Sequence, residues 1–353
     1  MSELPQRYIP LGGSDSGGFS TVIYCTDTHL DRKVAIKFIQ DEAEQKLILK
    51  ELSALLKMRS KHVVQVYDIV TDEKDALGIV EEYIEGDSLW DSDCPAQSQE
   101  AYLKTLWQVA AGIADMHEAG VIHRDIKPNN MKLDPEGVVK IFDFGLAKQC
   151  GIDAHTKGFK GTLGFAAPEL FNDATIAISP AIDTYAFGAT ALFLACKNLP
   201  AKMKMMPPLP ITDDKFSGLP VEIHTELKSL LNACLSYKPK ERPSMVTVRD
   251  ELARHLLGWK HQALAVYQGK SYLLNVRNPS VELNATGVGK VEILYTGLKF
   301  IVSVAVGEVF INNSPAIPGE EIPGSCVVAL GAAHHGSSRV YITFDIANPE
   351  VVL

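Results

Sequence analysis

Apolar residues follow two different periods along the chain, and the changes between them divide it into regions. Between Tyr8 and Asp87, short runs rich in β-branched residues predict strands: VIYC, VAIKFI, VVQVYDIV and LGIVEEYI. The segment EAEQKLILKELSALLKM, between the second and third of these runs, has helical periodicity. This first region is therefore expected to be a small sheet that carries one helix.

Helical periodicity dominates from Ser98 to about residue 257. The segment SQEAYLKTLWQVAAGIADMHEAG is amphipathic and stops at Gly120, a residue type that commonly ends helices. Further helices are predicted around residues 183–196, 221–236 and 244–257. The stretch MKMMPPLPITDDKFSGLP contains several prolines and is expected to be a long loop within this helical region.

After Trp259 the chain returns to short β-rich runs separated by Gly, Pro and Asn: SYLLNV, KVEILY, KFIVSVAV, VFIN, CVVAL and RVYITF. This change predicts a boundary near residues 258–265, and a chain of 353 residues suits two domains better than one core. The predicted domains are 1–258, with a β-rich part (about 8–85) and a helical part (about 86–258), and 262–353. The fold class is α+β, followed by a small all-β domain that resembles a sandwich.

Composition and charge exclude several classes of protein. The hydrophobic share of 46% and charged share of 22% are those of a globular chain. A net charge of −9 gives no diffuse basic field for nucleic acid or an anionic membrane, so neither is an expected partner. The six cysteines are scattered without a CxxC pair, and no apolar run reaches the roughly 18 residues of a membrane span. These features, together with an N-terminus that lacks a signal pattern, predict a cytoplasmic protein.

Four short strings carry the candidate chemistry. Phosphate transfer to a hydroxyl requires that phosphates, metal and acceptor be held in line while their charge is neutralised. The strings supply lysine, aspartate and asparagine side chains for these tasks. In chain order they are Val34-Ala35-Ile36-Lys37, His123-Arg124-Asp125-Ile126-Lys127-Pro128-Asn129-Asn130, Asp143-Phe144-Gly145 and Ala167-Pro168-Glu169.

This set, in this order and spacing, resembles the signature of the eukaryotic-like serine/threonine protein kinases over about residues 8–257. The resemblance implies a bilobal kinase fold and transfer of the γ-phosphate of ATP to Ser or Thr hydroxyls of protein substrates. Asp125 would be the catalytic base, and Asn130 and Asp143 would hold Mg²⁺ as hard oxygen ligands. Lys127 matches the γ-phosphate lysine of Ser/Thr kinases.

The resemblance also assigns the remaining nucleotide contacts. Lys37 would contact the α- and β-phosphates and would be held by a helix glutamate, for which Glu51 is favoured over Glu44. Glu82 and Ile84 would bind adenine through their backbone groups, which places Glu81 at the gatekeeper position. A buried carboxylate there must find a donor or become protonated, so either Glu81 has a further partner or the register of this segment is off by one residue. The glycine-rich loop would cover the phosphates with Leu11, Gly12, Gly17, Phe19 and Val22.

This loop departs from the family pattern, because Ser20 stands where a third glycine is usual. Backbone amides can nevertheless cradle phosphate there.

Regulatory and scaffold residues follow from the same resemblance. Arg124 and Lys148 would bind a phosphate on the activation segment, with Thr156 as its acceptor. Thr162 matches a structural threonine that contacts the catalytic loop. Two further matches have structural roles. Asp183 would brace the catalytic loop, and Arg242 would pair with Glu169.

The C-terminal region resembles the last strands of a forkhead-associated domain at residues 309–314, 323–331 and 340–344. Arg277 and Ser280 are the only nearby candidates for its phosphothreonine readers, and they do not fit the spacing. A β domain that docks onto the kinase or onto a partner protein is the alternative. For the whole chain, a pseudokinase scaffold and a phosphopeptide-binding adaptor compete with the active kinase.

Overall fold

The computed structural model describes residues 4–16, 20–39, 56, 58–71, 76–91, 98–144, 148–149, 155–156, 161–171, 176–211 and 213–347. The chain divides into two compact units, Met1–Leu252 and Ala253–Val352. Each unit has its own hydrophobic core. The predicted glutamates Glu44 and Glu51 and the loop residues Gly17 and Phe19 lie outside the described residues.

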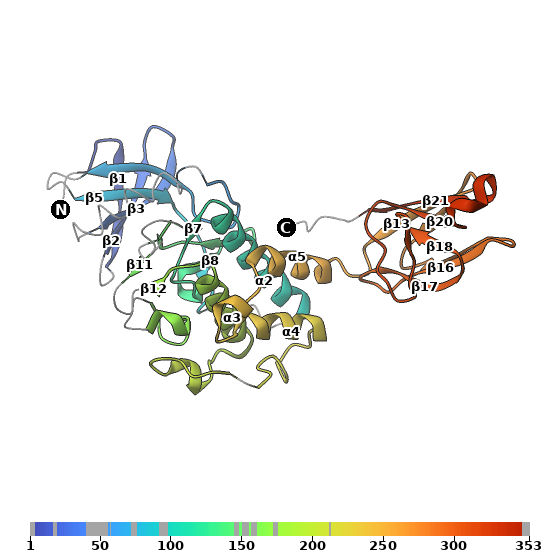
Figure 1. Ribbon diagram of the computed structural model, residues 1–353. Helices are drawn as coiled ribbons and strands as arrows, with labels where there is room; N and C mark the ends of the chain where they lie inside the picture. The colour runs from blue at the N-terminus through green and yellow to red at the C-terminus, as the bar shows by residue number, and fades with distance from the viewer. Residues whose placement is uncertain are drawn as a thin grey trace. The chain divides into compact units, whose positions relative to one another are not determined.

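The first unit begins with a five-stranded antiparallel sheet in the order β1-β2-β3-β5-β4 (Figure 1). The strands are β1 (Tyr8–Ser16), β2 (Ser20–Asp27), β3 (Arg32–Ile39), β4 (Val66–Thr71) and β5 (Leu77–Glu82). Side chains alternate between the two faces of a strand. On β3, Val34 and Ile36 enter an apolar core with Val80 of β5, so Ala35 and Lys37 lie on the opposite face.

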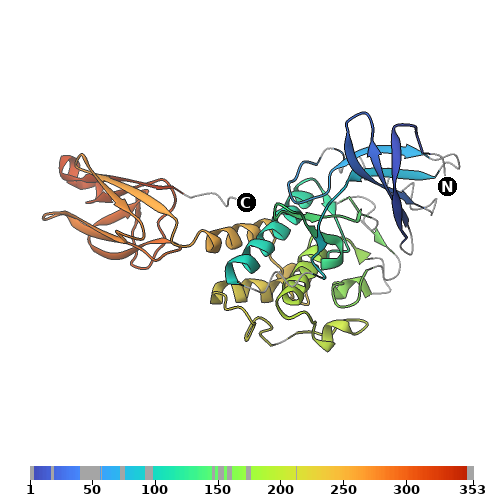
Figure 2. The ribbon, with the colours of Figure 1, turned by 180° about the vertical axis from the view of Figure 1, so that it is seen from behind.

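Helices form the other part of this unit, at the end away from the sheet; Figure 2 shows the same arrangement from behind. The helices are α2 (Gln99–Glu118), α3 (Ala181–Cys196), α4 (Thr225–Cys234) and α5 (Met245–Leu256). All four were predicted from periodicity and are confirmed. Residues 182–195 of α3 are all buried, because this helix packs against both α2 and α4.

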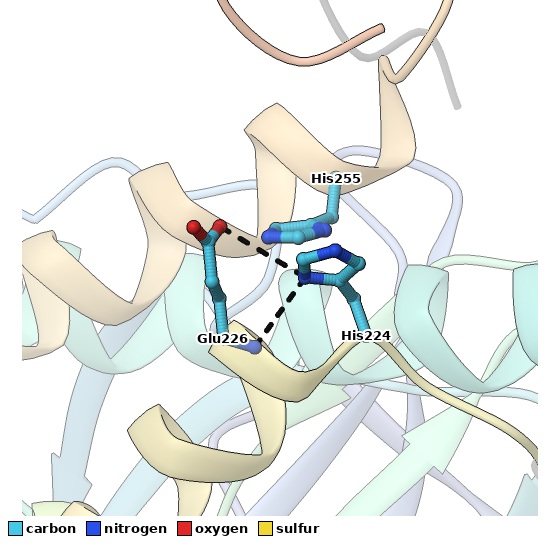
Figure 3. Close-up of side chains that lie close together, drawn as sticks. All are labelled: His224, Glu226 and His255. Carbon is cyan, nitrogen blue, oxygen red and sulfur yellow. Dashed lines mark hydrogen bonds and ion pairs between the residues drawn. The ribbon is translucent and has the colours of Figure 1, made fainter. Parts of the chain in front are cut away.

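Side chains at the helix starts explain where two of these helices begin. The Ser98 hydroxyl accepts a hydrogen bond from the Ala101 N–H (3.1 Å) and caps α2. At α4 the cap is His224, whose Nδ1 accepts from the Glu226 N–H (3.3 Å) and lies 3.9 Å from Glu226 Oε2 (Figure 3). The C-terminus of α2 is marked by Gly120 at φ +77°, as the sequence predicted.

Short strands and 3₁₀ turns connect these parts and shape the loops between them. The short strands are β6 (Asp87–Ser88), β7 (Val121–Ile122), β8 (Met131–Leu133), β9 (Val139–Ile141), β10 (Lys148–Gln149), β11 (His155–Thr156) and β12 (Ile176–Ala177). The 3₁₀ turns are Pro128–Asn130, Pro168–Phe171, Ala201–Lys204 and Pro239–Glu241. Pairing in the order β6-β8-β9 brings the segment between β7 and β8 next to the residues that follow β9.

The second unit is a β-sandwich, as predicted. One antiparallel sheet has the order β14-β13-β21-β20-β18-β19 and the other β15-β16-β17. The strands are β13 (Gln262–Tyr267), β14 (Lys270–Leu274), β15 (Ser280–Ala285), β16 (Gly289–Tyr295), β17 (Phe300–Gly307), β18 (Val309–Ile311), β19 (Ser314–Pro315), β20 (Cys326–Leu330) and β21 (Val340–Ala347), with a 3₁₀ segment at Ala333–Ser338. Val291, Ile293 and Val302 of the smaller sheet share one core with Val328 and Ile342 of the larger.

Arg277 lies in the turn between β14 and β15, and Ser280 is the first residue of β15. Asn275 Oδ1 accepts from the Arg277 N–H (2.9 Å) and shapes this turn, while Arg277 itself is exposed. The forkhead-associated resemblance remains a prediction. Among the described residues, no helix has both the length and the apolar character needed to cross a membrane.

Candidate active site

One buried carboxylate fixes the backbone at the start of the catalytic loop, residues 123–130. Asp183, in the first turn of α3, accepts hydrogen bonds from the backbone N–H of His123 (2.8 Å) and of Arg124 (2.7 Å). His117 Nε2 lies 3.0 Å from the same carboxylate. Burial alone would raise the pKa of Asp183, but the hydrogen bonds from His117 and the Arg124 N–H lower it. The predicted role of Asp183 as a brace is confirmed.

Three side chains converge on the carboxylate of Asp125. The Thr162 hydroxyl donates to Oδ1 (2.9 Å), and Lys127 Nζ (2.7 Å) and Asn130 Nδ2 (3.1 Å) donate to Oδ2. Lys127 Nζ also donates to Thr162 Oγ1 (2.8 Å), which closes the cluster. The predicted contact of Thr162 with the catalytic loop is confirmed, and the orientation of Asp125 is fixed from both of its oxygens.

Asp143 is held against the same loop and against the sheet. The Phe142 N–H donates to the Asn130 carbonyl (3.0 Å), which ties the segment after β9 to the catalytic loop. Lys37 Nζ, on β3, donates to the Asp143 carboxylate. Burial lowers the pKa of Lys37, but the nearby Asp143 and Glu81 charges outweigh it and the pKa is raised. The structure thus brings Lys37 and Asp143 together across 106 residues of sequence.

A cavity of about 320 Å³ opens beside this pair. Its walls are mostly apolar, and Lys37 and Asp143 add two charged groups to them, which suits a ligand with an apolar part and a charged part. The lining residues are Val22, Tyr24, Ala35, Lys37, Val64, Glu81, Glu82, Tyr83, Ile84, Lys132, Phe142 and Asp143. Of the predicted loop residues Val22 lines the cavity, whereas Leu11 is exposed and Gly12 has φ +83°.

Glu82 and Ile84 lie in the cavity wall, as the hinge prediction requires. The Glu82 carboxylate pairs with Lys140 Nζ (2.8 Å), and the Ile84 carbonyl accepts from Lys132 Nζ (3.3 Å). Glu81 is only 8% exposed. Burial raises the pKa of Glu81 to about 7, although the Lys37 charge opposes this shift. Of the two outcomes foreseen for this buried acid, the structure favours protonation near neutral pH.

Sequence analysis did not name Tyr24 or Lys132 as cavity residues. Tyr24 lies two positions after Val22 on β2, so strand alternation is a signal that could have found it. Lys132 has no local signal, because it reaches the cavity through the pairing of β8 with β6.

The structure describes only part of the predicted phosphate switch. Arg124 is buried and has φ +72°. Lys148 lies in β10, opposite Ile122, and Thr156 lies in β11, opposite Ile176. The side chains of Lys148 and Thr156 are outside the described part, so a phosphate switch at Thr156 remains a prediction.

Glu169 and Arg242 form the predicted pair. Arg242 Nη1 lies 2.7 Å from Glu169 Oε1, and Nη2 lies 2.9 Å from Oε2, which makes the contact bidentate. Arg242 also donates to the carbonyls of Ala181 (2.8 Å) and Ser236 (2.8 Å). The pair therefore ties the Ala-Pro-Glu string to the start of α3 and to the chain after α4.

Comparison with known proteins places this site in a family. The protein kinase domain model matches residues 12–255. The chain belongs to the protein kinase family.

Several of its relatives carry serine/threonine kinase names. A probable serine/threonine-protein kinase of Dictyostelium discoideum is 31% identical over 208 residues, which cover 58% of this chain and 30% of that protein. One of Clostridium perfringens is 35% identical over 175 residues (47% and 25%). The carbon catabolite-derepressing protein kinase of Secale cereale is 29% identical over 248 residues (66% and 48%). The chain thus spans less than half the length of these three relatives.

Proposed function

We propose that this chain is an ATP-dependent protein kinase that transfers the γ-phosphate to Ser or Thr hydroxyls of protein substrates. The observation that carries the proposal is the convergence of Thr162, Lys127 and Asn130 on the Asp125 carboxylate. This carboxylate is held ready to accept a proton, and it lies on the loop that also fixes the Lys37 and Asp143 pair beside the cavity. The names of the relatives support the choice of Ser and Thr.

Each group has a role that its surroundings support. Asp125 orients the acceptor hydroxyl and takes its proton, because both carboxylate oxygens are fixed by hydrogen bonds. Lys127 offers its ammonium group to the γ-phosphate from beside Asp125. Lys37, whose side chain is 13% exposed in the cavity wall, offers a positive charge to the α- and β-phosphates.

The donor set also fits Mg²⁺. Asp143 supplies a carboxylate and Asn130 an amide oxygen, both of which are hard ligands of the kind that Mg²⁺ prefers. The Asn130 amide nitrogen donates hydrogen bonds to Asp125, so the amide oxygen is the atom that remains available for a metal. When bound, Mg²⁺ would neutralise charge on the transferred phosphate.

The proposal includes a cytoplasmic location. Cys25, Cys234 and Cys326 are buried free thiols, as expected in a reducing compartment.

The direct test is phosphorylation of a degenerate peptide library with labelled ATP and Mg²⁺, followed by mapping of the modified residues. We expect label on Ser and Thr peptides and none above background on Tyr peptides. The matched control is Asp125→Asn, which keeps the shape of the side chain and removes the proton acceptor. Absence of transfer by a folded wild-type chain, or equal transfer by Asp125→Asn, would contradict the proposal.

A chain ending at Gly258 should retain catalysis. The cut falls one residue before Trp259, whose N–H donates to the Gly297 carbonyl (2.6 Å) and whose ring contacts Tyr295. Every proposed catalytic residue lies before this point. We expect peptide phosphorylation within a few fold of the full-length rate. A shortened chain that is monodisperse and inert would show that the β domain is part of the active unit.

A further inference from the structure

The second unit contains a small cavity that is lined by cations and by no carboxylate of a described residue. Its volume is about 280 Å³, and its walls are residues 259–262, at the start of β13, and residues 275–277, in the turn after β14. Pairing of Ala263 with Leu274 brings these two segments to the same end of the larger sheet. The whole chain carries a net charge of −9, so a site with only positive charge stands apart and would attract an anion.

Lys260 and Arg277 supply the positive charge of this cavity. Both residues are exposed, and within the described part of the chain neither side chain pairs with a carboxylate. Asn275 Oδ1 accepts from the N–H groups of Arg277 (2.9 Å) and Asn278 (3.0 Å), which shapes the turn and leaves the Asn275 amide nitrogen to donate to a ligand. Burial lowers the pKa of His261, so its ring is neutral at pH 7 and adds no charge.

An indole ring is held in place beside these cations. Trp259 is 58% exposed, yet its ring packs so closely on Gly297 that a Cβ there would lie 2.4–2.7 Å from three ring carbons. The ring also meets Tyr295 edge-on, with the ring centroids 5.9 Å apart. At φ +63° the Trp259 backbone is in a region that bulky residues rarely adopt, so these contacts have to hold it there. An exposed ring in a fixed position offers a surface on which a flat group can stack.

The charges and the ring together define a class of ligand. A phosphate monoester carries about −1.5 to −2 charges at neutral pH, which matches one lysine and one arginine, and arginine can bind phosphate through two parallel hydrogen bonds. At about 280 Å³ the cavity suits one small molecule, and a flat ring attached to the phosphate would lie on the indole.

We propose that this cavity binds a nucleoside monophosphate, with its phosphate at Lys260 and Arg277 and its base stacked on Trp259. Stacking uses a face that all bases share, so we expect no strong preference for one base. The cavity shares no lining residue with the one beside Lys37, so it is a second site, independent of the proposed catalysis.

Calorimetry of the full-length chain with guanosine monophosphate (GMP) tests the proposal. Arg277→Gln and Lys260→Gln each remove one charge from an exposed side chain and should each weaken GMP binding by about 10-fold. Trp259→Leu removes the stacking surface and should weaken binding by roughly 10- to 100-fold. Lys270→Gln is the matched control, because Lys270 is an exposed lysine of β14 outside the cavity, and it should bind GMP as the wild type does.

Three further ligands separate the parts of GMP from other phosphate carriers. Guanosine lacks the phosphate and inorganic phosphate lacks the base, so each should bind the wild type at least about 10-fold more weakly than GMP. A phosphoserine peptide supplies a phosphate without a base and should also bind more weakly. Tighter binding of this peptide than of GMP would overturn the choice of ligand.

The location of binding is tested separately from its existence. GMP binding that is unchanged in the Lys260, Arg277 and Trp259 variants, or that is lost in Lys37→Met, would overturn the proposal, because the nucleotide would then bind elsewhere. Failure of the folded wild type to bind GMP would overturn it as well and would leave the proposed catalysis untouched. Thermal melting establishes that each variant is folded, and the two glutamine variants decide the test if Trp259→Leu does not fold.

Discussion

Replacing Asp143 with asparagine should lower the rate of phosphate transfer by roughly a thousand-fold or more. Groups that neutralise charge on a transferred phosphate contribute about 10³- to 10⁵-fold in enzymes of this class. Asp143→Asn removes the charge that would hold Mg²⁺ and that pairs with Lys37. Because the Asp143 side chain is 40% exposed and asparagine keeps an oxygen that can accept from Lys37 Nζ, the melting temperature should remain close to that of the wild type. Initial rates with a peptide substrate and a thermal melt measure the two effects.

A matched control for this change is Asp134→Asn. Asp134 Oδ1 accepts from the N–H groups of Glu136 and Val138 in the turn before β9, and an asparagine side chain keeps an oxygen for these bonds. We expect wild-type activity from this variant. Full activity in Asp143→Asn would remove Asp143 from the proposed metal site.

Replacing Arg242 with alanine should lower the free energy of unfolding by about 3–5 kcal/mol. The Arg242 side chain is fully buried and Glu169 is 15% exposed, so the substitution leaves a largely buried carboxylate without its bidentate partner. It also removes the donors to the Ala181 and Ser236 carbonyls. Denaturant unfolding of the variant and of the wild type, monitored by far-UV circular dichroism, measures the loss in unfolding free energy.

Lys238→Ala provides the comparison for the Arg242 prediction. Lys238 pairs with Glu241 at 3.0 Å, but the two side chains are 76% and 53% exposed, so solvent screens the pair. Its loss should cost no more than about 1 kcal/mol. Equal effects of Lys238→Ala and Arg242→Ala would show that burial of the Arg242 pair does not contribute to stability.

The fold could be predicted well where a local pattern is strong. The helix from Gln99 to Glu118 combines an amphipathic period with a Ser98 cap and a glycine just after its end, so its predicted bounds are close to the observed ones. Strands β13 and β15 were not among the runs identified. In β15 exposed polar residues alternate with the buried ones, so the apolar signal is weak. In β13 two of the buried positions are small alanines, Ala263 and Ala265. The pairing of β13 with β21, near the other end of the domain, could not be inferred from local patterns.

The candidate site was predictable to the extent that its residues are close in sequence. Asp125, Lys127 and Asn130 stand within six positions, and the structure holds them in one cluster. The partnership of Lys37 with Asp143, in contrast, depends on the packing of β3 near the segment after β9. Sequence reasoning assigned Lys37 a glutamate partner from a helix, and neither candidate, Glu51 nor Glu44, lies among the described residues.

The buried carboxyl of Glu81 couples folding of the nucleotide-free chain to proton uptake. Its pKa is about 7 in the folded protein and about 4.5 when solvated, so between these values the folded state holds a proton that the unfolded state has released. The stabilising contribution of this group is fully present below about pH 4.5 and is lost as pH rises through 7. The loss amounts to roughly 3 kcal/mol. A single acid in the cavity beside Lys37 thus makes the folded chain less stable at pH 7 and above than in acid solution.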